Sequence, residues 1–557
     1  MKLNSLSLAL TGAALLLGAP LTFAQQPPAA AEAARQDALV REALARYDSG
    51  LEALQAQGSP AAQLAIGGVR ELRMAEVVEL ALEKNLDIAV ERLSPQAVDY
   101  QIAGIRNAYR PVASSTVGQR DQVNPATNQL NGGNSVNNQT TTYNFGVTQA
   151  VPYFGGNFQL TWNNTRSATN STFSTYNPGF NSQLTALYQQ PLLRGLLIDN
   201  NRQQLAITQI NRAIADETLR ATIASTLANV RNAYWDLVFT RSGVDVARRS
   251  LALAEKLIED NQARVEVGTM APIDVVQAEA EAANRRQALA VAEAALQTAE
   301  LSLKRFIVSG TDDPLWRQEL RPIDLPSIEP PPRDIEGAVR RALGDRTDLA
   351  TARKNLDSSD ITLRFFRSQT LPALDLNASY GATGQGGVRT ERSGLGGTIS
   401  NVIPGGYSDA LRLLTQRDFP TWNLSVTLSY PIGGSNADAQ YARARVQRNQ
   451  STARLRALEL QVATEVTNTA LTVQSNLRRV EAAQAARALA ERRLEAEQSK
   501  FEVGLQTNFF VVQAQRDLAD AQNAELRALA DYRKSLVNFE RVQEAPGGGG
   551  FGGGGGQ

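Results

Sequence analysis

The chain has 557 residues, with 56 Lys and Arg, 56 Asp and Glu, no cysteine and no histidine. The neutral balance gives no global charge that would draw the protein to nucleic acid, and the missing cysteines exclude a disulfide framework and a lipid anchor on a mature N-terminal cysteine. The missing histidines remove the commonest metal ligand and every Ser-His or Cys-His nucleophile pair. We therefore predict that the protein is not an enzyme and has no catalytic residue, cofactor, metal or nucleic-acid partner.

The N-terminus carries an export signal over residues 1–24. Lys2 supplies the positive end, Leu6 to Leu17 form an apolar run, and a small-residue cleavage site precedes Gln25. This order of features argues against a buried N-terminal helix. The apolar run is too short to span a bilayer and no second run follows it, so no membrane helix is predicted in the mature chain.

An internal duplication is the most informative pattern. The segment from Arg264 to Ala278 recurs from Lys500 to Ala514, with seven of fifteen positions identical at a separation of 236. Further identities occur upstream at a separation of 261, because the first copy carries extra residues before Arg264. The upstream pairs begin with Ala81 and Ala342 and end with Pro111 and Pro372.

The duplication divides the chain into segments. An N-terminal extension of unassigned role (25–70) precedes the first copy (71–320), a proline-rich connector (321–333) and the second copy (334–543). The final segment, 544–557, is rich in glycine and is predicted to be disordered, because it has no side chains to bury.

Each copy shows the same order of elements. A helix, 74–109 or 335–369, is ended by a proline and followed by polar β-segments. A long helix then runs over 201–263 or 437–501, and after a short break a helix returns to residue 306 or 542. Sixty helical residues span about 90 Å. A coiled coil or a helical conduit needs such a length, and a compact soluble domain does not.

The predicted strands alternate between apolar and polar residues, as from Trp422 to Tyr430, from Leu374 to Tyr380 and from Phe158 to Trp162. A half-solvated antiparallel sheet alternates in the same way as a strand that faces lipid on one side. The export signal, the lack of spanning helices and the aromatic residues at strand ends favour the membrane interpretation.

Long polar stretches separate these strands at 124–142, 170–182 and 381–406, and we interpret them as extracellular loops. Within the first copy, 141–151 and 158–166 form a possible additional hairpin. Whether this hairpin enters the membrane is left open by the sequence.

The repeated Val-Gly and Val-Val-Gln-Ala motifs between two long helices resemble the outer-membrane efflux protein family of the TolC type. So do the strand-to-helix motifs Gln190–Gly195, which contains Pro191, and Tyr430–Gly434, which contains Pro431 and Gly433. The resemblance covers roughly residues 72–542. It implies an α+β fold, in which an outer-membrane β-barrel with four strands per chain is closed by trimerisation and continued by a long α-helical barrel.

The resemblance also implies a function and partners. The expected protein is the outer-membrane exit duct of a tripartite efflux or type I secretion system in a Gram-negative bacterium, extending into the periplasm and passing substrates passively. The partners implied are two further copies, a periplasmic adaptor, an energised inner-membrane transporter and outer-membrane lipid. The exported substrate is not predicted.

The turns after the long helices are the candidate docking sites for the adaptor. They consist of Val267, Gly268 and Thr269 in the first copy and Val503, Gly504 and Leu505 in the second. A glycine that ends a helix accounts for both turns locally. The resemblance adds that they form the periplasmic tip.

Asp274 and Phe510 occupy equivalent positions in the two copies and are the candidate pore-entrance residues. A carboxylate in the first turn of a helix is favoured by the helix dipole. Asp274 also matches the acidic ring that the family carries at its tunnel entrance. Phe510 removes a second ring from that position, which suggests a partly hydrophobic gate. Nearby charges, including Glu281 and Arg285, are interpreted as solvated faces and i,i+4 pairs.

Two competing hypotheses remain. A periplasmic or surface-attached coiled-coil scaffold without channel activity would also have an export signal and long helices. An enzyme with paired carboxylates is the third possibility, but no acidic pair lies in a pocket-forming segment.

Overall fold

The computed structural model describes residues 68–126, 134–172, 174–324, 328, 330–331, 333–394 and 397–546. The predicted signal peptide, nearly all of the N-terminal extension and most of the glycine-rich tail lie outside the described residues. The described residues belong to one compact unit.

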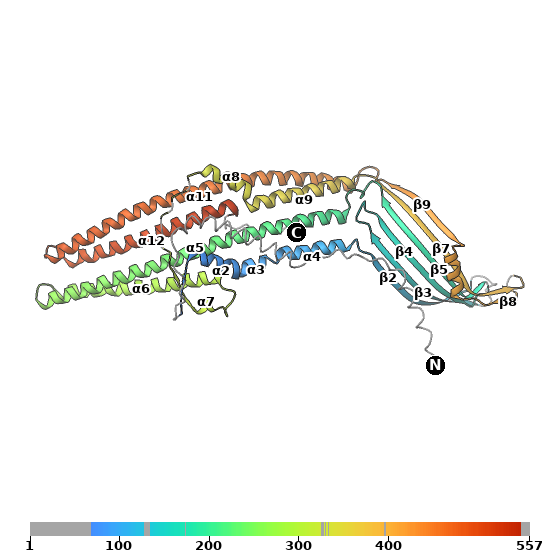
Figure 1. Ribbon diagram of the computed structural model, residues 1–557, viewed down its shortest axis with the longest axis horizontal. Coiled ribbons are helices and arrows are strands. Elements are labelled where there is room, and N and C mark those ends of the chain that lie inside the picture. Colours follow the sequence, from blue (N-terminus) through green and yellow to red (C-terminus); the bar gives the residue numbers. More distant parts are fainter. Residues whose placement is uncertain are drawn as a thin grey trace, which may run out of the picture. The chain divides into compact units, whose positions relative to one another are not determined.

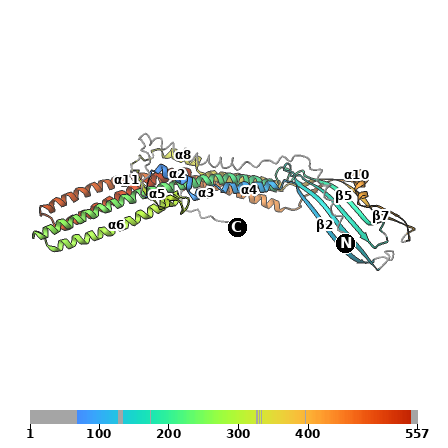
Figure 2. The ribbon, with the colours of Figure 1, turned by 60° about the horizontal axis from the view of Figure 1, so that its bottom comes forward.

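Long helical hairpins dominate this unit (Figure 1, Figure 2). The two longest helices each have 67 residues, and each packs against the helix that follows it, α5 on α6 and α11 on α12. The predicted long and returning helices are thus confirmed. The helices of the described residues are α2 (Met74–Lys84), α3 (Leu86–Glu91), α4 (Ser94–Asn107), α5 (Asn200–Glu266), α6 (Pro272–Ile307), α7 (Pro314–Arg317), α8 (Ile335–Asp345), α9 (Thr347–Gln369), α10 (Tyr407–Gln416), α11 (Asn436–Glu502) and α12 (Asn508–Glu544).

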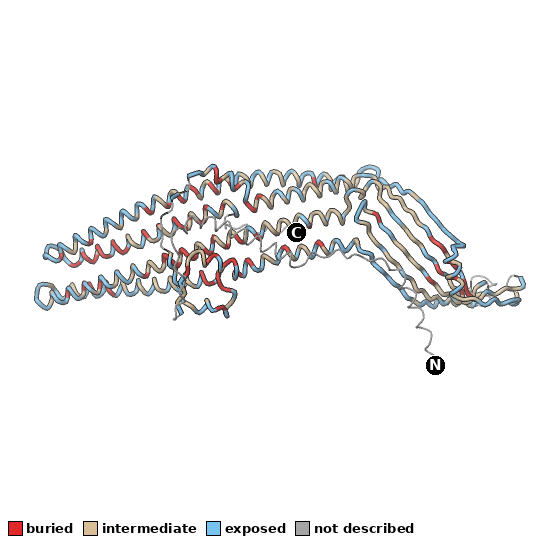
Figure 3. The backbone as a smooth tube through the Cα atoms, viewed as in Figure 1, coloured by how far each residue is buried: buried red, intermediate tan, exposed pale blue. Residues whose placement is uncertain are grey.

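The hydrophobic core lies between these helices (Figure 3). One cluster surrounds Tyr234 where α2, α5 and α6 meet, and a second surrounds Tyr532 where α8, α11 and α12 meet. Burial of apolar side chains drives this packing. Among the described residues, every helix falls short of the length or the apolar character that crossing a bilayer requires.

The first helix of each copy is interrupted, which corrects the prediction of one continuous helix over 74–109 and 335–369. One break in each copy falls at Asn85 or Arg346, which are equivalent in the duplication and share an extended backbone, and the first copy has a further break between Glu91 and Ser94. Asn85 Nδ2 donates to the Phe306 carbonyl at 3.1 Å, and Arg346 Nη1 donates to the equivalent Val542 carbonyl at 3.2 Å. The breaks at Asn85 and Arg346 therefore each tie the start of their copy to the end of its returning helix.

Arg346 is the strongest test of this junction. Its guanidinium is 1 % exposed and pairs with Asp348 at 2.8 Å and Glu465 at 2.7 Å. We expect Arg346→Ala to reduce the free energy of unfolding by about 3 kcal/mol, because two carboxylates and a carbonyl each lose the buried guanidinium as a partner. Thermal unfolding followed by circular dichroism measures this, with the exposed Arg492→Ala in α11 as control. Equal melting temperatures for the two variants would contradict the assignment.

The strands form two sheets. A small parallel sheet pairs β1 (Val69–Leu72) with β6 (Glu319–Pro322). The large sheet has seven antiparallel strands in the order β2-β3-β4-β5-β7-β8, with β9 also paired to β7. Its strands are β2 (Val112–Pro125), β3 (Ser135–Ala150), β4 (Asn157–Thr169), β5 (Tyr176–Pro191), β7 (Ala373–Arg392), β8 (Ile399–Ile403) and β9 (Pro420–Ser429).

This sheet corrects two expectations. It contains more than four strands, because the possible hairpin is present as β3 and β4. The predicted loops at 124–142, 170–182 and 381–406 contain strand at 124–125, 135–142, 176–182, 381–392 and 399–403, since β2, β3, β5 and β7 extend into them and β8 lies within the last. Asparagine and glycine suggested loops, but cross-strand pairing satisfies their backbone groups over long stretches.

The large sheet has two chemically distinct faces. Residues paired across adjacent strands point to the same side, so the register defines each face. One face is apolar and carries Val117, Phe145, Val147, Phe158, Leu160, Trp162, Leu184, Ala186, Leu374, Leu376, Ala378, Tyr380, Trp422, Leu424, Val426 and Leu428. The other face is mostly Ser, Thr, Asn and Gln. The predicted alternation is confirmed for all three segments that showed it.

Candidate functional site

The two turns between the long helices have the same backbone geometry. In the first, the Thr269 N–H donates to the Arg264 carbonyl at 2.9 Å and the Gly268 N–H to the Val265 carbonyl at 3.0 Å. The second repeats this pattern with Leu505, Gly504 and their partners. Gly268 and Gly504 both have φ of 77°. This is the left-handed helix stop in which glycine avoids a steric penalty.

Both turns leave apolar side chains in solvent. Val267 is 73 % exposed, Val503 70 % and Leu505 78 %. A Cβ added to Gly268 or Gly504 would meet no atom within 4 Å. The turns are therefore open surfaces, with an exposed backbone flanked by apolar groups, on which another protein can pack.

The returning helices begin just after these turns and contain the two candidate entrance residues. Asp274 lies in the first turn of α6, where the helix dipole favours its carboxylate. Phe510 lies in the first turn of α12, and its ring meets Phe509 edge to face at 5.6 Å between centroids. One hairpin end is thus acidic and the other aromatic.

Contacts near the turns join the two hairpins of the chain. The Arg264 guanidinium lies 4.4 Å from the centroid of the Phe501 ring and donates to the Phe501 carbonyl at 3.0 Å. Asn508 Nδ2 donates to the Asp274 carbonyl at 3.1 Å. A buried apolar cluster that includes Leu257, Phe501 and Val511 lies beside them. The ends of the hairpins are therefore held together by polar and apolar contacts.

A buried carboxylate adds a second junction between the two hairpins, farther from the turns along α6 and α12. Glu281 in α6 is 3 % exposed and pairs with Arg285 at 2.7 Å and with Arg516 of α12 at 2.5 Å. The hydrogen bond to Glu281 raises the pKa of Arg516 above its usual value. The interpretation of Glu281 as part of a solvated face was wrong, because its partner comes from the second copy. The i,i+4 pair with Arg285 is present as predicted.

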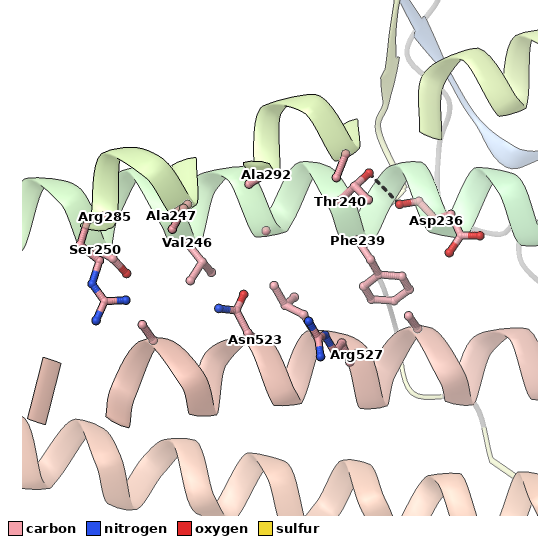
Figure 4. Close-up of a pocket in the computed structure, with 16 residues that line it drawn as sticks. Asp236, Phe239, Thr240, Val246, Ala247, Ser250, Arg285, Ala292, Asn523 and Arg527 are labelled. Atoms are coloured by element: carbon pink, nitrogen blue, oxygen red, sulfur yellow. Dashed lines mark hydrogen bonds between the residues drawn. The ribbon is translucent and has the colours of Figure 1, made fainter. Parts of the chain in front are cut away.

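Between these junctions and the central core the hairpins separate around a cavity of about 330 Å³. Figure 4 shows Phe239 and Val246 of α5 facing Asn523 and Arg527 of α12 across it. Small residues such as Gly243 and Ala292 line much of the remainder. The hairpins are therefore loosely packed here, which leaves room for one to move against the other.

The strand-to-helix motifs connect the large sheet to the long helices. Pro191 ends β5, and Gly195 follows with φ of 85° before Asp199 caps α5. After β9, Pro431 precedes Gly433, whose φ is 91°. Both motifs are compact turns in which only glycine fits the backbone at low cost.

The sequence predicted the turns but missed Arg264, Asn508, Glu281 and Arg516 as the residues that join the hairpins. Their partners lie about 235 residues away. Among these four residues, the sequence singled out only Arg264, through its repeat as Lys500. In the described part of the chain, no group of three or more acidic side chains could hold a metal ion.

Comparisons with known proteins agree with this geometry. A family described as outer membrane efflux protein matches residues 77–307 and 338–542. Among solved structures, CusC has a TM-score of 0.62 at 13 % identity, with 85 % of this chain and 92 % of that chain covered. The Campylobacter jejuni CmeC outer membrane channel scores 0.59 at 14 % identity, covering 85 % of each chain.

The outer membrane protein VceC of Vibrio cholerae scores 0.59 at 15 % identity, covering 85 % of this chain and 96 % of that chain. A search of curated protein sequences finds no match. Identities this low establish a shared fold and leave substrate and partners to be argued from the residues.

Proposed function

Because the chain belongs to the outer membrane efflux protein family, we propose that it is the exit duct of a tripartite efflux or type I secretion system, through which substrates pass without covalent change. The protein is an efflux channel of the Gram-negative outer membrane that extends into the periplasm, and it is not an enzyme. Its fold is the α+β fold of the TolC-type channels. The expected resemblance is confirmed.

The two-faced sheet is the observation that carries the proposal. Its apolar face suits lipid and its polar face suits a water-filled lumen. The strands lead directly into α5 and α11, each of which extends about 100 Å at 1.5 Å per residue. This length suits a conduit that continues from the bilayer through the periplasm.

The proposed partners follow from the exposed turns. An adaptor docks on the apolar groups and exposed backbone at Val267–Thr269 and Val503–Leu505, and an energised inner-membrane transporter supplies the work. Three copies surround the lumen, so Asp274 and Phe510 are each repeated around its entrance. Three carboxylates at one level favour cations in transit, and the Phe510 rings narrow the path between them.

A coiled-coil scaffold is the alternative, and two measurements separate it from the duct. The duct stays with the outer membrane after carbonate washing and adds ion conductance to planar bilayers. A scaffold is extracted by carbonate and adds none. Recovery of the full-length protein in the wash, together with silent bilayers, would reject the proposal.

A further inference from the structure

The β3–β4 hairpin is an integral part of the large sheet. β3 pairs with β2 along the whole of that strand, from Val112↔Thr148 to Pro125↔Ser135. β4 pairs with β5 from Asn157↔Gln189 to Ser167↔Gly179. The hairpin therefore separates β2 from β5, and the sheet has six long strands together with the short β8.

The hairpin also continues both faces of the sheet. Its apolar side presents Phe145 and Val147 on β3 and Leu160 and Trp162 on β4, in register with Ala186 and Leu184 of β5. Its polar side carries Asn144, Thr148, Gln159 and Thr161, with Thr148 opposite Gln159 and Thr161 opposite Thr185 of β5. The hairpin thus has the same apolar and polar faces as the strands that we assign to the bilayer.

Toward the other end of the hairpin, polar groups on the apolar side are covered by α10. Asn164 and Ser182 are fully buried and hydrogen-bond at 2.7 Å, and the Tyr407 hydroxyl of α10 donates to Asn164 at 2.8 Å. A Cβ on Gly384 would overlap the backbone of Ala410, so glycine allows α10 to lie directly on β7. The polar atoms are thus shielded on the side that we assign to lipid.

The outer edges of the sheet, β2 and β9, have no partner beyond β3 and β7 among the described residues. Both are exposed along nearly their entire length, with Val117 at 75 % and Trp422 at 75 %. An open edge in hydrocarbon leaves unpaired N–H and C=O groups, each at a cost of several kcal/mol. The two edges run antiparallel to each other, so one copy can pair its β9 with β2 of the next.

Building on the proposed function, we propose that the β3–β4 hairpin is part of the membrane wall and that three copies close, β9 to β2, into a ring of eighteen long strands. Each free edge is thus occupied by a neighbouring chain of the trimer. The resemblance to four-stranded relatives predicted a ring of twelve. Since the circumference of a barrel is proportional to its strand number, the lumen of a ring of eighteen strands is about 1.5-fold wider than that of a ring of twelve.

The two faces restrict the register of this contact to shifts by an even number of residues. Apolar Leu424 and Val426 of β9 must lie on the same side as Val117 of β2, which excludes a one-residue slip. Pairing the first residue of β2, Val112, with the last residue of β9, Ser429, satisfies this condition. Thr116 then lies opposite Ser425 of the neighbouring copy.

The same register gives a closed barrel of ordinary geometry. Following paired residues across the sheet from Val112 leads to Asn423, six residues before Ser429. Each chain therefore shifts the register by six residues, or about 20 Å along the strands, across six strand spacings that total about 29 Å. The resulting strand tilt is about 35°, within the range of closed barrels.

Cysteine cross-linking tests the contact, and the natural chain has no cysteine to interfere. Thr116→Cys combined with Ser425→Cys should give a three-chain covalent species on oxidation in outer membranes. The matched control, Thr116→Cys with Val426→Cys, places the thiols on opposite faces and should remain uncross-linked. Equal cross-linking of both pairs, or a ring of another chain number, overturns the proposed register and closure.

Spin labels test the hairpin separately. Labels at Val147 and Leu160 should collide with oxygen and be protected from a water-soluble nickel chelate, and labels at Thr148 and Thr161 should show the reverse. Val426 and Thr427 on β9 provide the matched reference pair. Suppose that labels on both faces of the hairpin are open to nickel, while labels on β9 alternate in accessibility and the protein still conducts ions. The eighteen-strand ring is then wrong, and the proposed function as a duct is unaffected. Silent bilayers and carbonate extraction would instead reject the proposed function.

Discussion

Proline in place of Gly268 or Gly504 is expected to abolish efflux while trimers still assemble. Each glycine has φ of 77° and donates its N–H to the carbonyl three residues earlier. Proline fixes φ near −65° and has no N–H, so the turn cannot form as observed. The apolar side chains that flank the turn are then displaced from the surface on which we propose that the adaptor docks. Efflux of a substrate of the cognate pump, measured in cells, reports the loss.

Asparagine is the matched control at the same positions, because it tolerates the left-handed conformation and keeps the N–H. Gly268→Asn and Gly504→Asn should retain most of the efflux. Trimer content, measured by native mass in detergent, should be equal in all four variants. Normal efflux from both proline variants would reject docking at these turns.

Charge reversal at the second junction is expected to open the channel. Arg516→Glu places a carboxylate beside the buried Glu281 and removes a salt bridge between the two hairpins. Arg516 is 46 % exposed and Glu281 keeps Arg285 as a partner, so losing the pair costs about 1 kcal/mol, to which the repulsion between the two carboxylates is added. Since the hairpins are loosely packed around the adjacent cavity, we expect them to separate. In planar bilayers the fraction of time spent open should rise at least tenfold.

The reciprocal variant keeps this prediction specific. Arg516→Glu combined with Glu281→Arg restores opposite charges and should return the channel toward its original closed fraction. Arg493→Glu is the control for charge alone, because Arg493 pairs with Asp517 within a single hairpin at 2.6 Å and is 52 % exposed. If Arg493→Glu opens the channel as strongly as Arg516→Glu, the junction through Glu281 is not what holds the hairpins together.

Local signals in the sequence were sufficient for the helices and the turns. The 67-residue helices follow from uninterrupted helix-forming sequence, and their ends from Gly268 and Gly504, whose stop signals act within one turn. The alternation from Trp422 to Tyr430 determined that one side of the strand would be apolar. These features depend on neighbouring residues, so sequence alone determined them.

Features that depend on distant pairing were decided only by the tertiary structure. The stretch from Ser135 to Thr142 is polar enough for a loop, and it becomes strand because β2 and β3 satisfy each other's backbone groups. Glu281 is typical of an exposed helix position, and it is buried because Arg516 reaches it from the other copy. The place of the β3–β4 hairpin in the sheet likewise depends on β5, which pairs with β4 along one edge and with β7 along the other. No local pattern records which strand will be a neighbour.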